Sequence, residues 1–223
     1  MPTTDTQAAA AGRLRITEIF YSLQGEAATV GLPTVFIRLT GCPLRCGYCD
    51  TSYAFQGGAW MELDEILEQV ASWKAAYVTV TGGEPLAQKP CALLLRQLCD
   101  AGYHVSLETS GALDVAPVDA RVCKVMDLKT PGSGEVERNR MENIALLTPH
   151  DQVKFVICSR EDYRWARAIV REYQLDSVCG VLFSPAHEQQ DATELADWIL
   201  QDRMPVRLQI QLHKILWGNE PGR

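Results

Sequence analysis

The sequence predicts an α/β fold, an incomplete, TIM-like (β/α) barrel of about six to seven mostly parallel strands. Strand-like and helix-like segments alternate along the 223 residues, and right-handed crossovers between such strands curl a sheet toward a barrel. The stretch between Phe55 and Ala76 is short, which favours a reduced barrel over a full eight-stranded one. We expect a disordered tail at residues 1–12 and a single domain over residues 13–223.

The expected strands are short runs rich in Val, Ile, Leu and Thr that end at Gly, Pro or polar residues. After a first strand at Leu14–Tyr21, they are Thr34–Thr40, Tyr77–Thr81, His104–Thr109, Val122–Leu128, Val153–Cys158, Val178–Phe183 and Val206–Leu212. Helical patterns lie between several of them, at Glu62–Trp73, Cys91–Ala101, Glu161–Tyr173 and Thr193–Leu200. The weakly patterned stretch Thr130–Asp151 is expected to hold a loop and a short helix.

Alternation within the strands indicates that the two faces of the sheet differ. Val35, Ile37 and Leu39 share one face of their strand, while Arg38 lies on the other face with Thr34. Four further strands also place polar residues on one face, and buried polar groups are costly unless they meet a partner. A solvated face of an open sheet explains any single strand. For five strands together, we favour a cavity that holds a polar ligand.

The composition is that of an ordinary globular enzyme, with 47% apolar and 22% charged residues. The net charge of −7 argues against a nucleic-acid-binding surface. No apolar run approaches the roughly 20 residues that span a membrane. The N-terminal segment also lacks the basic and apolar regions of a signal peptide. We therefore expect a cytoplasmic protein with neither a membrane nor a nucleic acid as its partner.

Three of the eight cysteines, Cys42, Cys46 and Cys49, are spaced C-x3-C-x2-C in the run GCPLRCGYCDT. No fourth cysteine or histidine lies nearby, whereas structural zinc takes four protein ligands. Each iron of a four-iron cluster wants a thiolate-type ligand, so three thiolates leave one iron open for chemistry. The remaining cysteines are expected to be buried free thiols, namely Cys91, Cys99, Cys123, Cys158 and Cys179.

Polar, glycine-rich loops follow three of the expected strands. They are Gly82–Pro85 (GGEP), Glu108–Gly111 (ETSG) and Asp127–Gly134 (DLKTPGSG). Ligands in α/β proteins bind at the carboxyl ends of parallel strands, so the three loops are expected to meet around one site. Each loop by itself is a weak signal, because such sequences are also ordinary turns.

The cysteine spacing after one strand and GGEP after the next together resemble the radical S-adenosylmethionine superfamily. The resemblance implies that the three cysteines hold a 4Fe–4S cluster, with S-adenosyl-L-methionine on the fourth iron. It further implies that the cofactor is cleaved to a 5′-deoxyadenosyl radical. The cofactor contacts that it implies in this part of the chain are Tyr48, Gly82, Gly83, Glu84, Ser110 and Gly111.

Longer motifs resemble the 7-carboxy-7-deazaguanine synthase family within that superfamily, over about residues 14 to 217. They are Ile16–Glu26 (ITEIFYSLQGE), Gly31–Cys42 (GLPTVFIRLTGC), Cys49–Thr51, Asp127–Gly134, Asp151–Ile157 (DQVKFVI) and His213–Lys214. The resemblance implies a carbon–nitrogen lyase that converts 6-carboxy-5,6,7,8-tetrahydropterin to 7-carboxy-7-deazaguanine with loss of ammonia, on the route to queuosine. It also implies a need for Mg²⁺.

The same resemblance assigns roles to individual residues, and it assigns no catalytic side chain because the cluster and the radical carry the chemistry. Substrate-binding residues are Leu23, Gln24, Gly25, Glu26, Arg38, Thr81 and His213. Further contacts to S-adenosyl-L-methionine are Asp127, Leu128, Lys129, Phe183, Ser184, Pro185 and Ala186. Thr51 is the magnesium ligand. The guanidinium fork of Arg38 suits a substrate carboxylate.

Simpler interpretations stay open for single residues. Arg38 alone fits a surface arginine, Thr51 a helix cap, and His213 a hydrogen-bonded structural histidine on the last strand. Two other functions also stay open: a glycyl-radical activating enzyme with a protein partner, and a zinc-stabilised binding module. The family further implies a homodimer and a reductant such as a flavodoxin, and nothing assigns a role to the tail Trp217–Arg223.

Overall fold

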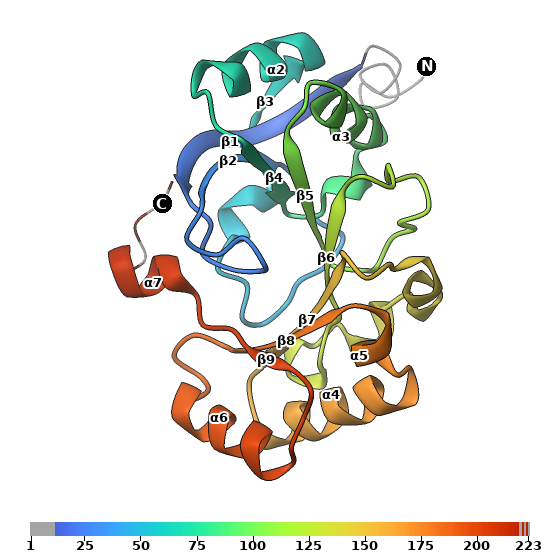
Figure 1. Ribbon diagram of the computed structural model, residues 1–223. Helices are drawn as coiled ribbons and strands as arrows, with labels where there is room; N and C mark the ends of the chain where they lie inside the picture. The colour runs from blue at the N-terminus through green and yellow to red at the C-terminus, as the bar shows by residue number, and fades with distance from the viewer. Residues whose placement is uncertain (1–11, 219, 221, 223) are drawn as a thin grey trace.

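A single curved sheet of nine strands forms the centre of the molecule (Figure 1). The computed structural model describes residues 12–218, 220 and 222, so the predicted tail lies outside the described residues apart from Gly12. The strand order is β3-β1-β2-β4-β5-β6-β7-β8-β9. From β2 onward along this order the strands are parallel, while β1 pairs antiparallel with both β2 and β3. The predicted α/β fold with a mostly parallel sheet is confirmed.

The strands are β1 (Arg13–Leu23), β2 (Pro33–Leu39), β3 (Ala59–Glu62), β4 (Tyr77–Gly82), β5 (His104–Thr109), β6 (Cys123–Asp127), β7 (Gln152–Ile157), β8 (Gly180–Pro185) and β9 (Arg207–Leu208). The α-helices are α2 (Leu63–Ser72), α3 (Cys91–Asp100), α4 (Arg160–Glu172), α5 (Leu175–Val178), α6 (Ala192–Gln201) and α7 (Leu212–Trp217). Short 3₁₀ turns are η1 (Ser52–Phe55), η2 (Pro85–Ala87), η3 (Pro131–Ser133), η4 (Val136–Arg138) and η5 (Met141–Leu146).

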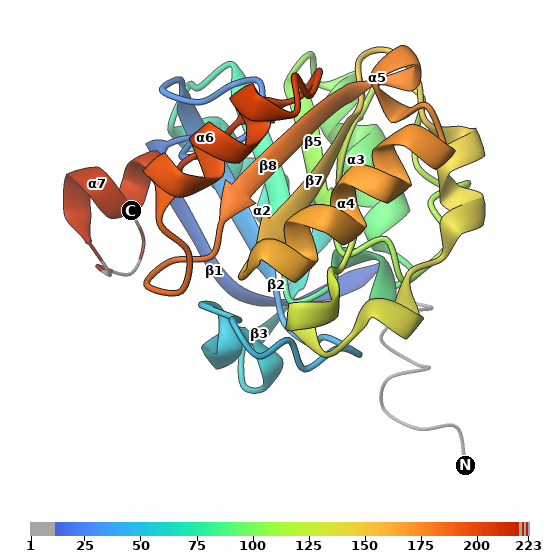
Figure 2. The ribbon, with the colours of Figure 1, turned by 90° about the horizontal axis from the view of Figure 1, so that it is seen from below.

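Helices cover the convex face of the sheet, and two apolar cores lie beneath them (Figure 2). Helices α2 and α3 bury residues such as Ile66 and Leu94 against β2, β4 and β5. Helix α4 buries Tyr163 among Phe155, Phe183 and their neighbours on β7 and β8. The apolar stripe of each helix and the apolar face of each strand meet here, which leaves the polar faces of the strands on the concave side.

Most predicted elements are confirmed within one or two residues, and three differ. The last predicted strand, Val206–Leu212, is wrong: only Arg207–Leu208 pairs with β8, and the chain then leaves the sheet and forms α7. Its alternating pattern belongs to an edge segment with Leu208 and Ile210 exposed, not to a paired strand. Strand β8 begins at Gly180 because Leu175–Val178 is a helical turn. Strand β3 was not predicted.

A β-bulge in β1 decides which of its side chains face the concave side. Ile16 pairs with Leu39, but the next residue in register is Glu18, opposite Arg38. Thr17 is therefore the extra residue. In a regular register Thr17 would lie opposite Arg38, and Glu18 would lie opposite Ile37 on the face of the apolar core. Beyond the bulge, Phe20 pairs with Phe36, and their rings stack with centroids 4.9 Å apart.

None of the helices in the described part of the chain has both the length and the apolar character that a bilayer crossing requires.

Candidate active site

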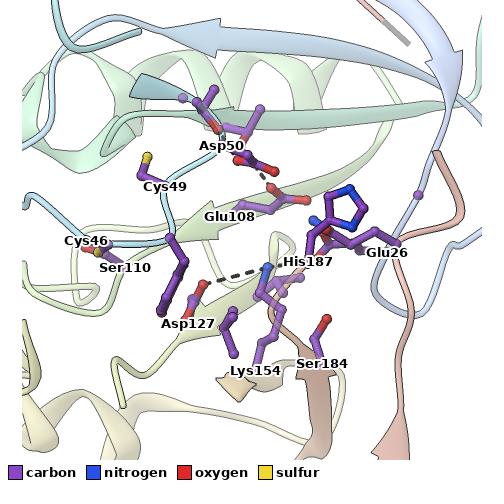
Figure 3. Close-up of a pocket in the computed structure, with 18 of the residues that line it drawn as sticks. Glu26, Cys46, Cys49, Asp50, Glu108, Ser110, Asp127, Lys154, Ser184 and His187 are labelled. Carbon is purple, nitrogen blue, oxygen red and sulfur yellow. Dashed lines mark hydrogen bonds and ion pairs between the residues drawn. The ribbon is translucent and has the colours of Figure 1, made fainter. Parts of the chain in front are cut away.

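A cavity of about 550 Å³ occupies the concave side of the sheet, at the carboxyl ends of the parallel strands (Figure 3). Its wall is formed by the loop after β2, the ends of β4 to β8, the loop after β1 and the C-terminal segment. The predicted cavity lined by the polar strand faces is therefore present. Most of the predicted site residues line it: Leu23, Gln24, Gly25, Glu26, Arg38, Cys42, Cys46, Tyr48, Cys49, Thr51, Thr81, Gly82, Gly83, Ser110, Asp127, Lys129, Ser184, Pro185, Ala186 and His213.

The three cysteines lie on the loop that follows β2, and all three line the cavity as free, partly exposed thiols. Desolvation by burial raises the pKa of each thiol above its ordinary value. Among the described residues, no three Cys, His, Asp or Glu side chains converge closely enough to hold one metal ion. Zinc ligands all lie about 2 Å from a single centre, whereas cysteines of a 4Fe–4S cluster bind different irons.

Glycines let the GGEP turn pack directly on the cysteine loop. A Cβ on Gly83 would lie 2.2 Å from the carbonyl oxygen of Gly41 and 2.8 Å from the Cβ of Cys42. The backbone N–H of Glu84 donates to that same Gly41 oxygen at 2.8 Å. Only glycine fits such a close backbone approach.

The Glu84 side chain does not line the cavity. It is fully buried, and its carboxylate accepts hydrogen bonds from the Thr109 hydroxyl, the Ser110 hydroxyl and the backbone N–H groups of Ser110 and Leu86. Glu84 thus holds the loop after β5 against the loop after β4. Its predicted contact with the cofactor stays a prediction, and the carboxylate is engaged by these four donors.

Three other predicted contacts also lie away from the cavity. Leu128 and Phe183 are fully buried in the apolar core, and a Cβ on Gly111 would meet the side chain of Met126 at 2.9 Å. Strand alternation explains the first two, because Asp127 and Ser184 next to them face the cavity instead. A motif match on consecutive residues does not distinguish the two faces.

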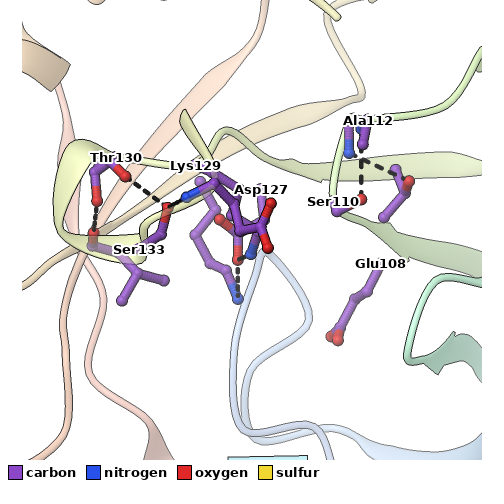
Figure 4. A network of polar contacts seen from close by, with 12 residues as sticks. Glu108, Ser110, Ala112, Asp127, Lys129, Thr130 and Ser133 are labelled. Carbon is purple, nitrogen blue, oxygen red and sulfur yellow. Dashed lines mark hydrogen bonds and ion pairs between the residues drawn. The ribbon is translucent and has the colours of Figure 1, made fainter. Parts of the chain in front are cut away.

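A network of polar contacts surrounds Asp127 and Lys129 after β6 (Figure 4). Lys129 pairs with Asp127 (Nζ–Oδ2 3.0 Å) and lies 5.6 Å over the ring of Tyr48. The side chain of Asn139 bonds both the N–H and the C=O of Lys129 and so fixes this segment. Asp127 Oδ1 and the Tyr48 hydroxyl are buried, and neither has a hydrogen-bond partner among the described residues. Such groups are costly unless a ligand satisfies them, which fits a polar cofactor here.

Amide and carboxylate groups of the loop after β1 form the opposite wall. Gln24 is held in place because its Nε2 donates to Thr79 Oγ1 at 3.0 Å and its Oε1 accepts from the Glu26 N–H at 3.1 Å. Lys154 Nζ lies 2.7 Å from Glu26 Oε2, and Gln211 Nε2 donates to Glu26 Oε1 at 2.7 Å. Burial alone would raise the pKa of the Glu26 carboxyl, but the Lys154 ammonium and these hydrogen bonds outweigh it and lower that pKa.

Arg38 projects into the cavity from the polar face of β2, as predicted. Its Nε donates to Glu18 Oε1 at 2.7 Å, and its guanidinium carbon lies over the rings of Phe20 and Tyr53 at 5.8 and 5.9 Å. Thr51 lies close by in the chain and donates to Asp50 Oδ1 at 2.7 Å. Hydroxyl and carboxylate oxygens are the hard donors that Mg²⁺ prefers, so this pair fits a magnesium ligand set.

His213 reaches the cavity from helix α7, not from a strand as the sequence predicted. The Leu212 N–H donates to the carbonyl oxygen of Gly25 at 3.0 Å, and a Cβ on Gly25 would lie 2.1 Å from His213 Nδ1. Desolvation lowers the pKa of His213, despite the nearby Glu26 carboxylate. The C-terminal segment therefore packs directly on the predicted substrate loop.

Several lining residues were absent from the predicted set, and they are Phe20, Asp50, Glu108, Lys154, Gln211 and Lys214. Glu108 accepts a hydrogen bond from Thr81 Oγ1 at 2.9 Å. The alternation that exposed Arg38 also places Glu108 and Lys154 on the polar faces of β5 and β7, so this signal was available in the sequence. Gln211 lies in the predicted last strand and Lys214 in the His213–Lys214 motif, but neither position showed that the C-terminal segment would cross to the cavity.

Comparison with known proteins agrees with this geometry. The Radical SAM superfamily model matches residues 36–198. The 7-carboxy-7-deazaguanine synthase of Koribacter versatilis is 43% identical over 222 residues, covering 93% of this chain and 98% of that protein. The enzyme of the same name from Chlorobaculum tepidum is 45% identical over 208 residues, covering 92% and 94%. The crystal structure of QueE from Escherichia coli has the same fold, with a TM-score of 0.71 at 22% identity, covering 96% and 100%.

The barrel, the cysteine loop and the superfamily match together define a radical S-adenosylmethionine enzyme. Within that superfamily, the identity to curated relatives over nearly their whole length shows that the chain belongs to the 7-carboxy-7-deazaguanine synthase family.

Proposed function

We propose that the cavity converts 6-carboxy-5,6,7,8-tetrahydropterin to 7-carboxy-7-deazaguanine with loss of ammonia, a step of queuosine biosynthesis. The observation that carries this proposal is the composition of the cavity lining. Free thiols, Arg38 and the Gln24–Glu26 loop all line the same cavity. Donor and acceptor groups of the loop suit the edge of a pterin, and a guanidinium suits its carboxylate.

Cys42, Cys46 and Cys49 would hold the 4Fe–4S cluster, and the surrounding loops would hold S-adenosyl-L-methionine. When bound, these two groups supply a 5′-deoxyadenosyl radical that removes a hydrogen atom from the substrate. The chain's own contribution is to bind and orient both molecules. Gly82, Gly83 and Ser110 bring backbone and hydroxyl groups close to the cysteine loop. Asp127 and the Tyr48 hydroxyl offer unpaired polar atoms on the same side.

On the substrate side, each side chain has one task. Arg38 binds the carboxylate, the amide of Gln24 supplies a donor and an acceptor at the ring edge, and the Glu26 carboxylate accepts hydrogen bonds there. Lys154 keeps Glu26 ionised, since it lies 2.7 Å from that carboxylate in a buried setting. His213 on α7 and Gln211 close the cavity from the C-terminal side. Thr51, with Asp50 beside it, is our candidate ligand for Mg²⁺ near substrate oxygens.

We also propose that the protein forms a homodimer and that an external one-electron reductant, such as a flavodoxin, reduces the cluster. All eight cysteines are free, which suits the reducing cytoplasm that we infer.

Anaerobic turnover tests the proposed function. The reconstituted protein is incubated with 6-carboxytetrahydropterin, S-adenosyl-L-methionine, a reductant and Mg²⁺, and the product is identified by mass. We expect 7-carboxy-7-deazaguanine and about four irons per chain. A colourless protein that holds one zinc would contradict the proposal. Cofactor cleavage without pterin conversion would instead favour a glycyl-radical activating enzyme.

A further inference from the structure

The bulge in β1 places a carboxylate beside the proposed substrate arginine. Because Thr17 is the extra residue, Glu18 lies directly opposite Arg38 on the cavity side of the β1–β2 pair. Directly opposed side chains on antiparallel strands lie within contact distance. Both side chains are largely buried, with exposed fractions of 24% for Glu18 and 16% for Arg38.

One carboxylate oxygen of Glu18 accepts hydrogen bonds from two neighbouring side chains. Glu18 Oε1 accepts from Arg38 Nε at 2.7 Å and from the Tyr53 hydroxyl at 2.8 Å. Tyr53 belongs to η1, which directly follows the Cys49–Thr51 segment, so this oxygen joins β1, β2 and the end of the cysteine loop. The Arg38 guanidinium also lies over the rings of Phe20 and Tyr53. These contacts restrain its position on several sides.

The contacts leave the outer edge of Arg38 available. Glu18 binds the guanidinium through Nε, and no hydrogen bond to Nη1 or Nη2 exists within the described part of the chain. A carboxylate binds a guanidinium most strongly through two parallel hydrogen bonds, which need a fixed planar fork. A fork that is held at Nε loses less rotamer entropy when the substrate binds.

We propose that Glu18 is a positioning residue that holds Arg38 ready for the carboxylate of the substrate, with Tyr53 as its support. The inference rests on the proposed function, because it assumes that Arg38 meets the substrate carboxylate. Glu18 itself does not touch the substrate. Its effect is therefore specific to ligands that carry the carboxylate and depends on Arg38.

Equilibrium binding of two pterins tests this specificity. The probes are 6-carboxypterin and pterin itself, which lacks the carboxylate, measured by fluorescence or calorimetry on the reconstituted protein with S-adenosyl-L-methionine. In the Glu18→Ala variant we expect about tenfold weaker binding of 6-carboxypterin and unchanged binding of pterin. Glu18→Gln, which keeps the acceptor oxygen, and Tyr53→Phe should each weaken 6-carboxypterin binding only about two- to threefold. In turnover, Glu18→Ala should raise KM with little change in kcat.

A double-mutant cycle separates positioning from a general structural role. In an Arg38→Ala background, Glu18→Ala should have no further effect on 6-carboxypterin binding, because the group that it positions is gone. Asp100→Ala is the matched control, since it breaks an exposed carboxylate–arginine pair with Arg121 far from the cavity. It should leave both ligands unaffected.

Two results would overturn the inference: equal weakening of both pterins in Glu18→Ala, or additive losses in the cycle. If Glu18→Ala does not fold, the Glu18→Gln and Tyr53→Phe variants still test whether Glu18 positions Arg38. Unchanged 6-carboxypterin binding in both variants would refute that role. Failure of the proposed function is distinguishable, because then the unmodified protein itself would not prefer 6-carboxypterin to pterin.

Discussion

Charged residues inside the barrel serve binding at a cost in stability. Glu108 accepts from Thr81 Oγ1 and lies near Lys154 and Glu26 on the cavity floor. Desolvation raises the pKa of its carboxyl, with the Glu26 charge adding to the effect and Lys154 opposing it. A raised pKa in the folded state means that this group stabilises the fold below its unfolded pKa and that the stabilisation is lost as the pH rises through the folded value.

A Glu108→Gln variant should therefore unfold at a higher urea concentration than the parent protein at pH 7.5, because it removes a buried charge that desolvation disfavours. The difference should shrink toward about pH 4, near the ordinary pKa of a glutamate, where the parent carboxyl is protonated as well. Urea unfolding at both pH values measures this. Glu172→Gln on the exposed side of α4 is the control. If Glu108→Gln were less stable than the parent protein at pH 7.5, the buried Glu108 charge would not be destabilising, and the prediction would be wrong.

The cysteine triplet gives a second prediction for single residues. Cys49→Ala should lose the bound iron, the brown colour and all turnover, since two thiolates cannot replace three around one cluster. Cys99→Ala, on α3 outside the cavity, is the matched control and should keep about four irons per chain. Iron analysis after anaerobic reconstitution measures whether each variant still binds the cluster. Full iron content in Cys49→Ala would show that Cys49 is not a cluster ligand.

The loops around the site are held together by close backbone contacts and by one buried carboxylate. The turn after β4 packs on the loop after β2, with the Gly83 N–H bonded to the Leu39 carbonyl oxygen at 3.1 Å. The Glu84 carboxylate then links that turn to the loop after β5 through Thr109 and Ser110. The cysteine loop is thus positioned by two neighbouring strand ends.

Gly83→Ala should disturb this packing, because the added methyl would lie 2.2 Å from the backbone oxygen of Gly41, which cannot move without the cysteine loop. We expect a loss of about 1–3 kcal/mol in the free energy of unfolding, as for other overpacked sites, and reduced iron content. Denaturant unfolding and iron analysis measure the two effects. Gly47→Ala in the same loop, with the nearest atom 4.0 Å from the new Cβ, should show neither. If Gly83→Ala and Gly47→Ala had the same unfolding free energy and the same iron content, the steric explanation would be wrong.

The C-terminal segment after β9 closes one side of the cavity but contributes little to the two apolar cores. The chain leaves the sheet after β9 and crosses to the loop after β1, where Gln211 bonds Glu26 and the Leu212 N–H bonds the Gly25 oxygen. Lys214 Nζ lies 3.8 Å from Asp50 Oδ2 on the other rim. None of the described residues of this segment belongs to either apolar core.

A chain that ends at Leu208 should therefore keep its fold and its cluster but bind substrate poorly. We expect an unchanged far-UV circular dichroism shape and iron content, with at least about tenfold weaker binding of 6-carboxypterin, since several polar contacts are lost together. Gln211→Ala removes one of those contacts and should show a smaller loss. Unchanged affinity of the truncated chain would show that the segment is not part of the substrate site.

Local patterns were enough to predict much of this molecule. The proposed ligands of the cluster could be named because Cys42, Cys46 and Cys49 lie within one short loop, so their spacing already limits their geometry. The strands with polar and apolar faces were predictable because side chains alternate along any strand. The same rule, applied strictly, would have excluded Leu128 and Phe183 and included Glu108 and Lys154.

The sequence by itself determined the class of chemistry, since spacing and alternation act between residues that are neighbours in the chain. Only the tertiary structure decided which groups face one another. The bulge at Thr17 brings Glu18 to Arg38, and the path of the chain after β9 brings His213 to Gly25. A shift of one residue in register, or a strand that ends a few residues early, changes such contacts without a visible change in composition. The burial of Glu84 beneath Thr109 and Ser110 was likewise decided by which strand ends are neighbours in the sheet.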